Sequence, residues 1–86
     1  MRTVVCGDMN SELSDPALQR LLRAAGLRAL EAEGPTNFER DARIDHVLLL
    51  EGDAGGPPAE TQYTELSDHA LVRARLSASS AASNRM

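Results

Sequence analysis

Large aromatic side chains are almost absent from this sequence, which has no Trp, one Phe and one Tyr in 86 residues. Aromatic groups usually contribute much of the area that a core buries. A chain of this length also buries only about 60% of the surface that its unfolded form exposes. The core must therefore be built from Ala, Leu and Val, which make up most of the 42% apolar content. Such a core suffices for a sheet with a helix or two packed on it, within one domain.

One helix is marked by its start and stop signals. Asp15 suits the N-cap and Pro16 the first turn, where a missing N–H is tolerated. Gly26 supplies a left-handed stop. The stripe expected to be buried has the i, i+3, i+4, i+7 spacing and consists of Leu18, Leu21, Leu22 and Ala25. These signals predict a helix over residues 16–25.

Three strands are predicted in the first part of the chain. Residues 3–6 form a short β-branched apolar run, typical of a strand buried on both faces. Within it, Cys6 is expected to be a small buried hydrophobe. Residues 27–32 could extend the helix, but Gly26 before them favours a strand. Residues 44–50 are rich in Ile, Val and Leu and predict a central strand.

Two further strands, over residues 60–66 and 70–76, follow the Gly-Gly-Pro-Pro turn within residues 52–58. In the last strand, apolar residues at the even positions 70–76 alternate with Leu71, Arg73 and Arg75 at the odd positions, as in a half-buried strand. The expected fold class is α/β (α+β), with one mixed sheet of about five strands and one main helix. Residues 1–76 form the predicted folded part. The Ser/Ala-rich residues 77–86 are predicted to be a disordered tail.

The composition argues against several classes of protein. The formal net charge of -4 and a pI of about 5.0 lack the basic character that dominates nucleic-acid affinity. A single cysteine permits neither an internal disulfide nor a Cys-rich zinc site. No apolar run approaches the ~20 residues of a membrane span. Because no signal peptide is visible, a cytoplasmic location is favoured, provided that the natural N-terminus is present.

Polar side chains lie where folding alone does not place them. Asp8 and Asn10 directly follow the first strand, at the edge where α/β sheets hold ligands. A simple turn is the alternative. Asp45 interrupts the apolar strand over residues 44–50, and a buried carboxylate needs a cation, a hydrogen-bond donor or a metal. An ion pair with Arg43 or Arg40 is the alternative for it.

A third polar group, Ser67-Asp68-His69, lies between the last two predicted strands. Taken alone, this group is better explained by a turn in which Ser and Asp cap backbone amides. His46 follows Asp45 directly, so its side chain must point to the opposite face of the strand. It is interpreted as a surface or packed histidine.

The order of the three motifs is more specific than any one of them. Gly7-Asp8-Met9-Asn10, Arg43-Ile44-Asp45-His46 and Ser67-Asp68-His69 each follow or lie on a predicted strand. This order resembles the endonuclease/exonuclease/phosphatase family, whose members have the DNase I-like fold. That family has Gly-Asp-x-Asn, Ile-Asp-Tyr/His and Ser-Asp-His motifs in this order. Pro35-Thr36 is similar to the family's threonine-containing loop.

The resemblance implies a role for each matching residue. Asp8 would position or deprotonate the attacking water, and Asn10 would donate a hydrogen bond to the phosphate. His69 would contact the scissile phosphate or act as acid/base, held by Asp45. Asp68 would help to bind Mg²⁺ or Mn²⁺. Together these groups could support attack of water on phosphorus. They are expected to converge at one edge of a single sheet, with Asp45 raising the pKa of His69.

The resemblance covers residues 4–76 and implies only the C-terminal half of a four-layer DNase I-like sandwich. The half that carries the family's conserved metal-binding Glu has no counterpart here. We therefore expect part of a divalent-metal-dependent phosphoesterase, cleaving phosphodiesters or phosphomonoesters, with weak metal binding and little activity alone. Its partners would be a phosphoester of unknown class and the missing half of the domain. The alternative is a noncatalytic small α/β module that dimerises or binds a partner through an uncovered sheet face.

Overall fold

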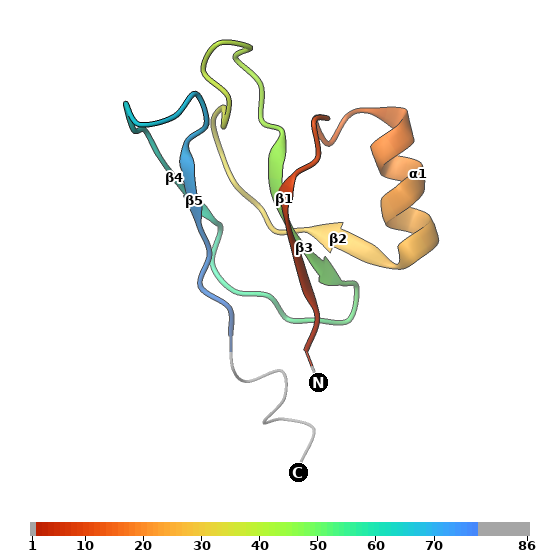
Figure 1. Ribbon diagram of the computed structural model, residues 1–86. Coiled ribbons are helices and arrows are strands. Elements are labelled where there is room, and N and C mark those ends of the chain that lie inside the picture. Colours follow the sequence, from red (N-terminus) through yellow and green to blue (C-terminus); the bar gives the residue numbers. More distant parts are fainter. Residues whose placement is uncertain (1, 78–86) are drawn as a thin grey trace.

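The computed structural model describes residues 2–77, which form one helix and two antiparallel sheets (Figure 1). The first sheet has the order β1-β3-β2 and consists of β1 Val4–Asp8, β3 Asp45–Leu50 and β2 Leu27–Ala29. The second is a hairpin of β4 Glu60–Gln62 and β5 Leu71–Arg73. The fold is therefore small α+β, as the sequence indicates.

The expectation of a single mixed sheet with about five strands is wrong. β3 is the central strand of the first sheet and already pairs with β1 on one side and β2 on the other. No edge of β3 is left for the strands that follow it. The chain turns away after β3, and the hairpin connects to the rest through isolated bridges such as Ala32↔Ala59 and Asn37↔His69. The strand expected over residues 60–66 ends at Gln62.

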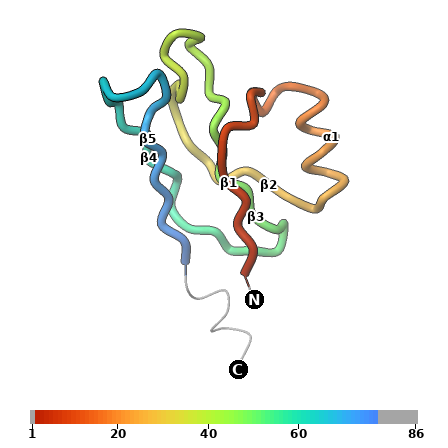
Figure 2. The backbone as a smooth tube through the Cα atoms, in the orientation of Figure 1, coloured from red at the N-terminus to blue at the C-terminus, as the bar shows by residue number. Residues whose placement is uncertain are grey.

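The three-stranded sheet lies between the helix and the hairpin (Figures 1 and 2). Side chains of β3 alternate between its two faces. On one face, Leu48 packs against the helix. On the other face, Leu49 and Val47 pack against residues of the hairpin layer, including Val72 and Leu76. The even positions from Ala70 to Leu76 are more buried than the odd ones, which confirms the alternation predicted for the last strand.

The helix α1, Pro16–Ala25, begins and ends as predicted. The Asp15 side chain accepts a hydrogen bond from the Ala17 N–H at 2.8 Å, and Gly26 adopts a left-handed conformation with φ of 67°. Leu18 and Leu22 are buried against the sheet, but Leu21 is 56% exposed. The predicted buried face of the helix was too wide. A short helix on a three-stranded sheet buries only the side chains that point directly at the sheet.

Strand β1 is the other departure from expectation, because all five of its residues are exposed. It is an edge strand that pairs only with β3, and neither the helix nor the hairpin covers it. Cys6 is consequently exposed rather than buried. Periodicity cannot distinguish such an edge strand from a buried one, because both contain short apolar runs.

A groove of about 450 Å³ remains between β1 and the hairpin layer. Its wall includes apolar side chains of the three-stranded sheet and of residues 70–76, which include β5. Asp45 also lines the groove. These apolar lining residues are Val4, Cys6, Val47, Ala70, Val72, Ala74 and Leu76.

Within residues 2–77, no helix has the length and apolar character needed to cross a membrane. The predicted disordered tail lies outside the described residues, apart from Ser77.

Candidate functional site

Two carboxylates face one another across the first sheet. Asp8 at the end of β1 and Asp45 at the start of β3 are direct partners in the antiparallel register. Their side chains therefore leave the sheet on the same face, the one that the hairpin covers. Like charges directly opposite each other destabilise a sheet. This end of the strand pair is therefore suited to a positive charge.

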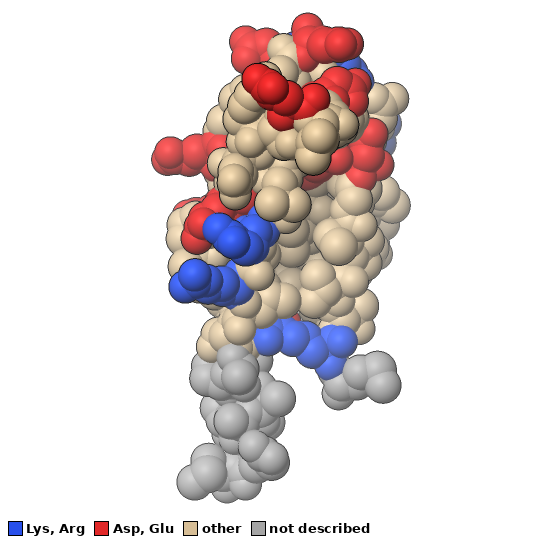
Figure 3. Space-filling view, turned by 60° about the vertical axis from the view of Figure 1, so that its left-hand side comes forward, with Lys and Arg blue, Asp and Glu red and all other residues tan. Residues whose placement is uncertain are grey.

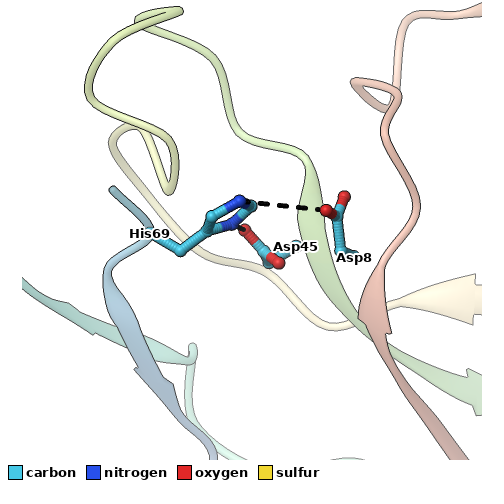
Figure 4. A group of neighbouring side chains, drawn as sticks. All are labelled: Asp8, Asp45 and His69. Carbon is cyan, nitrogen blue, oxygen red and sulfur yellow. Dashed lines mark hydrogen bonds and ion pairs between the residues drawn. The ribbon is translucent and has the colours of Figure 1, made fainter. Parts of the chain in front are cut away.

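His69 meets these carboxylates from the opposite layer, just before β5 (Figure 4). Its Nδ1 lies 2.7 Å from Oδ2 of Asp45, and its Nε2 lies 3.8 Å from Oδ2 of Asp8. The expected hydrogen-bonded pair of Asp45 and His69 is thus present. The exposed fraction of the side chain is 29% for His69 and 49% for Asp8, so the group is open to a ligand.

The environment raises the pKa of His69 above its ordinary value of 6.5. The largest cause is the hydrogen bond to Asp45, which favours the imidazolium form. Desolvation opposes this effect, and the negative charges of Asp45, Asp68 and Asp8 add to it. The direction agrees with the expectation from sequence.

The alternative partners proposed for Asp45 are engaged elsewhere. Arg43 donates through Nε to the Gly34 carbonyl at 2.7 Å, and through Nη2 to the Glu33 carbonyl and the Thr61 hydroxyl. Arg40 donates from Nη1 to Oδ1 of Asn10 at 2.6 Å. Among the hydrogen bonds and ion pairs of residues 2–77, the side-chain partner of the Asp45 carboxylate is therefore His69.

The three side chains form a candidate metal-binding group. Asp8, Asp45 and His69 each offer one ligand atom, and these atoms all lie within 4.8 Å of one another. Mg²⁺ is commonly held by one or two carboxylates and completes its shell with water and substrate oxygens. Asp8 and Asp45 fit that pattern. His69 adds a nitrogen ligand of the type that Mn²⁺ and softer divalent metals accept.

Thr36 holds both halves of this group in place. Its side chain is fully buried, and its Oγ1 accepts hydrogen bonds from the backbone N–H of Ile44 at 2.9 Å and of Asp45 at 3.1 Å. Its carbonyl accepts from the N–H of Ala70 at 2.7 Å. One residue thus fixes the start of β3 beside Asp45 and the segment that begins β5 beside His69.

Asn37 also contacts the group, although sequence reasoning did not select it. It is 5% exposed, and its Nδ2 lies 3.4 Å from Nε2 of His69. Its Oδ1 accepts from the Arg40 backbone N–H at 3.0 Å, so the amide must present its NH₂ group to the imidazole. Nε2 of neutral His69 is then an acceptor, and Nδ1 carries the proton shared with Asp45. The only signal in the sequence was its position directly after Thr36.

The other two predicted site residues lie outside the three-residue group. Asn10 flanks it: its N–H donates to Oδ1 of Asp8 at 2.7 Å, with a left-handed φ of 53°. Asp68 is exposed, and its carbonyl accepts from the Phe38 N–H at 3.2 Å. Its carboxylate influences the site through its charge on His69. The three-residue group forms between the three-stranded sheet and the hairpin layer. This corrects the expectation that the site residues converge at one edge of a single sheet.

His46 agrees with its interpretation as a packed histidine. It is 5% exposed, and its Nε2 lies 2.8 Å from the Ser11 carbonyl oxygen. This contact connects β3 with the loop after β1, on the face opposite to Asp45.

Comparison with protein-family models, curated proteins and solved structures found no match to this chain.

Proposed function

We propose that this chain supplies the acid–base and phosphate-contacting part of a divalent-metal-dependent phosphoesterase. The observation that carries the proposal is the meeting of Asp8, Asp45 and His69, which come from three separate motifs. A tight group of two carboxylates and an imidazole with a raised pKa combines a metal ligand set with an acid/base. The reaction is attack of water on a phosphodiester or phosphomonoester.

Each residue has a role that fits its contacts. Asp8, the more exposed carboxylate, orients or deprotonates the attacking water. His69 contacts the scissile phosphate and exchanges a proton at Nε2, while Asp45 holds its Nδ1. Asn10 donates to a phosphate oxygen. A Mg²⁺ or Mn²⁺ ion bound by the carboxylates, with Asp68 nearby, would neutralise the charge on the phosphate oxygens.

In this proposal the site is incomplete within residues 2–77. Mg²⁺ requires about six ligands in octahedral geometry, and Asp8 and Asp45 supply two carboxylates. The remaining protein ligand would come from the other half of a DNase I-like sandwich, of which this chain is the C-terminal part. The groove between the first sheet and the hairpin layer is consistent with a fold in which further strands fill that space. Weak binding of Mg²⁺ by this chain alone follows.

Paramagnetic Mn²⁺ provides the test. We expect Mn²⁺ to broaden the NMR signals of the His69 imidazole and Mg²⁺ to reverse the broadening by competition. Asp8→Asn and Asp45→Asn should weaken the effect, whereas Glu31→Gln removes an exposed carboxylate elsewhere and should leave it unchanged. Broadening that survives both aspartate substitutions would place the metal elsewhere and end the proposal.

A noncatalytic role is the second candidate, and the groove together with the exposed β1 strand favours it. Val4 and Val5 are 40% and 39% exposed on a strand whose outer edge has no partner among residues 2–77. Such an edge can pair with another strand. In this role, the chain would dimerise or bind a partner there. Sedimentation equilibrium distinguishes the two: a concentration-dependent dimer that Val5→Lys disperses supports the module, and a monomer at all concentrations argues against self-association.

A further inference from the structure

A ring of contacts runs through the candidate site and includes two of its residues, Asp8 and His69. Asp8 bonds to Asn10, Asn10 to Arg40, Arg40 to Asn37, and Asn37 to His69. The ring closes where His69 approaches Asp8 at 3.8 Å (Figure 4). The proposed function assigns no role to Arg40, although it is the cation in this ring.

Arg40 is held by its own loop before it reaches across to Asn10. The loop closes through paired backbone hydrogen bonds, from the Asn37 N–H to the Ala42 carbonyl at 2.9 Å and from the Ala42 N–H to the Asn37 carbonyl at 3.2 Å. The Arg40 backbone N–H is fixed by Asn37 Oδ1. The guanidinium therefore extends from a loop that is held in place. Only one of its five N–H groups donates to Asn10.

The bond from Arg40 also decides which way the Asn10 amide faces. Guanidinium groups only donate, so the Asn10 atom that receives this bond must be the carbonyl Oδ1. The NH₂ group of Asn10 is then turned away from Arg40. The backbone of Asn10 is held as well, by its N–H bond to Asp8 and its left-handed φ. The result is a fixed amide donor beside a guanidinium with spare donors.

We propose that Arg40 and Asn10 form a binding seat for the nonbridging oxygens of a phosphate group. Guanidinium groups recognise phosphate through two parallel N–H bonds, and a neighbouring amide adds a third donor. This inference rests on the proposed function and deepens it, since it names the residue that holds the substrate's phosphate. Arg40 is a substrate-binding residue that none of the three motifs contains.

The charges around the site explain why such a cation is needed. The carboxylates of Asp8 and Asp45 repel a phosphate, and Figure 3 shows acidic side chains gathered at the end of the molecule that carries the loops above β4 and β5. Arg43 is committed to the carbonyls of Glu33 and Gly34. Arg40 is exposed and keeps donors for a ligand, so it can offset this repulsion.

Titration of the ¹⁵N-labelled chain with inorganic phosphate and with methyl phosphate tests the seat. We expect both ligands to shift the Arg40 Nε–H and Asn10 side-chain amide signals. Arg40→Gln should weaken binding by about tenfold or more, because it removes charge-assisted hydrogen bonds. Arg40→Lys keeps the charge without the planar fork and should lose part of the affinity. The control Arg20→Gln removes an exposed arginine on α1 and should change nothing.

Failure of the seat can be distinguished from failure of the metal site. Asp8→Asn removes a proposed metal ligand but can still accept the Asn10 N–H, so phosphate binding should persist or tighten in this variant. If phosphate binding depends on Arg40 and Mn²⁺ does not bind, the proposed metal site is wrong and the proposed seat is supported. Mn²⁺ binding with phosphate affinity unchanged in Arg40→Gln would overturn the seat alone. Absence of phosphate binding to the parent chain would also overturn it, because the donors are already in position.

Discussion

The Nδ1 atom of His69 lies 2.7 Å from Oδ2 of Asp45, although 24 positions separate the two residues and they belong to different layers of the fold. The pair joins the central strand β3 to the segment that begins β5. Its consequence is chemical as well as structural, since the same bond is the main reason for the raised pKa of His69.

Asp45→Asn should lower the pKa of His69, because it removes both the hydrogen bond to a charged partner and a negative charge. An NMR titration of the His69 imidazole measures this change. Asp68→Asn is the matched control: it removes a nearby charge without a hydrogen bond, so its effect should be smaller. A His69 pKa that Asp45→Asn leaves unchanged would contradict the role of the pair.

The pH dependence of stability follows from the direction of that shift. The folded pKa of His69 lies above the ordinary value of 6.5, so the pair's contribution is fully present below pH 6.5. It is lost as the pH rises through the folded pKa. Urea unfolding of the parent and Asp45→Asn should therefore show a stability difference that is larger just below pH 6.5 than well above it. A difference that grows with pH would be inconsistent with this linkage.

Asn37→Ala should raise the pKa of His69 further. The Asn37 amide presents a donor to Nε2 of neutral His69, and protonation of Nε2 places two donors against each other. Removing that donor relieves the conflict. In both the parent and the variant, ¹⁵N shifts at high pH should show the proton on Nδ1, because the bond from Nδ1 to Asp45 remains. A His69 pKa that Asn37→Ala leaves unchanged would show that Asn37 only fills space.

Thr36→Val should destabilise the fold by roughly 1–3 kcal/mol, because it leaves the N–H groups of Ile44 and Asp45 without their acceptor. Valine has nearly the shape of threonine, so packing is preserved. Thr3→Val is the control, because Thr3 is exposed. Urea denaturation measures both variants. Equal stability of the two would mean that water replaces the lost hydroxyl.

Arg2→Gln should reduce stability at neutral pH and have little effect in strong acid. The Arg2 guanidinium bonds to both carboxylate oxygens of Asp53 and, with the Gly55 N–H, lowers the pKa of Asp53 to about 2. A depressed folded pKa gives stability that is present above the ordinary value of 3.8 and is lost as the pH falls through about 2. Urea unfolding at neutral pH and near pH 2 compares the two regimes. A loss of stability that is the same at both would exclude the ion pair as its cause.

The 86-residue chain alone should hydrolyse bis(p-nitrophenyl) phosphate at close to the uncatalysed rate in the presence of Mg²⁺. Its two carboxylates and imidazole leave most of an octahedral shell to water. Mg²⁺ should likewise raise the melting temperature only slightly. Robust turnover that His69→Ala abolishes would show that these three groups suffice.

The sequence predicted the elements whose signals are local. Asp15 and Gly26 mark the helix because capping depends on a few neighbouring residues. The pairing of Asp45 with His69 could be predicted from the sequence because a carboxylate on an apolar strand needs a hydrogen-bond donor. The motif order indicated His69 as that donor. The resulting group differs from the expected set in that Asn10 and Asp68 lie beside it.

Features that depend on tertiary pairing were not predictable in this way. The exposure of Cys6 follows from β1 being at the edge of its sheet, and strand order is not encoded in the apolar pattern of one strand. The split into two sheets follows from β3 having both edges occupied. Asn37 and Arg40 lie in a loop without periodicity, so no face could be assigned to them.

The ring of contacts that includes Asp8 and His69 also affects how this chain folds. Its members come from three stretches that are distant in sequence, and the contact between Arg40 and Asn10 alone spans 30 positions. Contacts of that separation close long loops, whose entropy must be lost before the contacts form. The ring should therefore assemble late, after the helix and local turns. A phosphate ligand that binds only the finished ring would draw the folding equilibrium toward the native state by mass action, so ligand supply and chain stability would be linked.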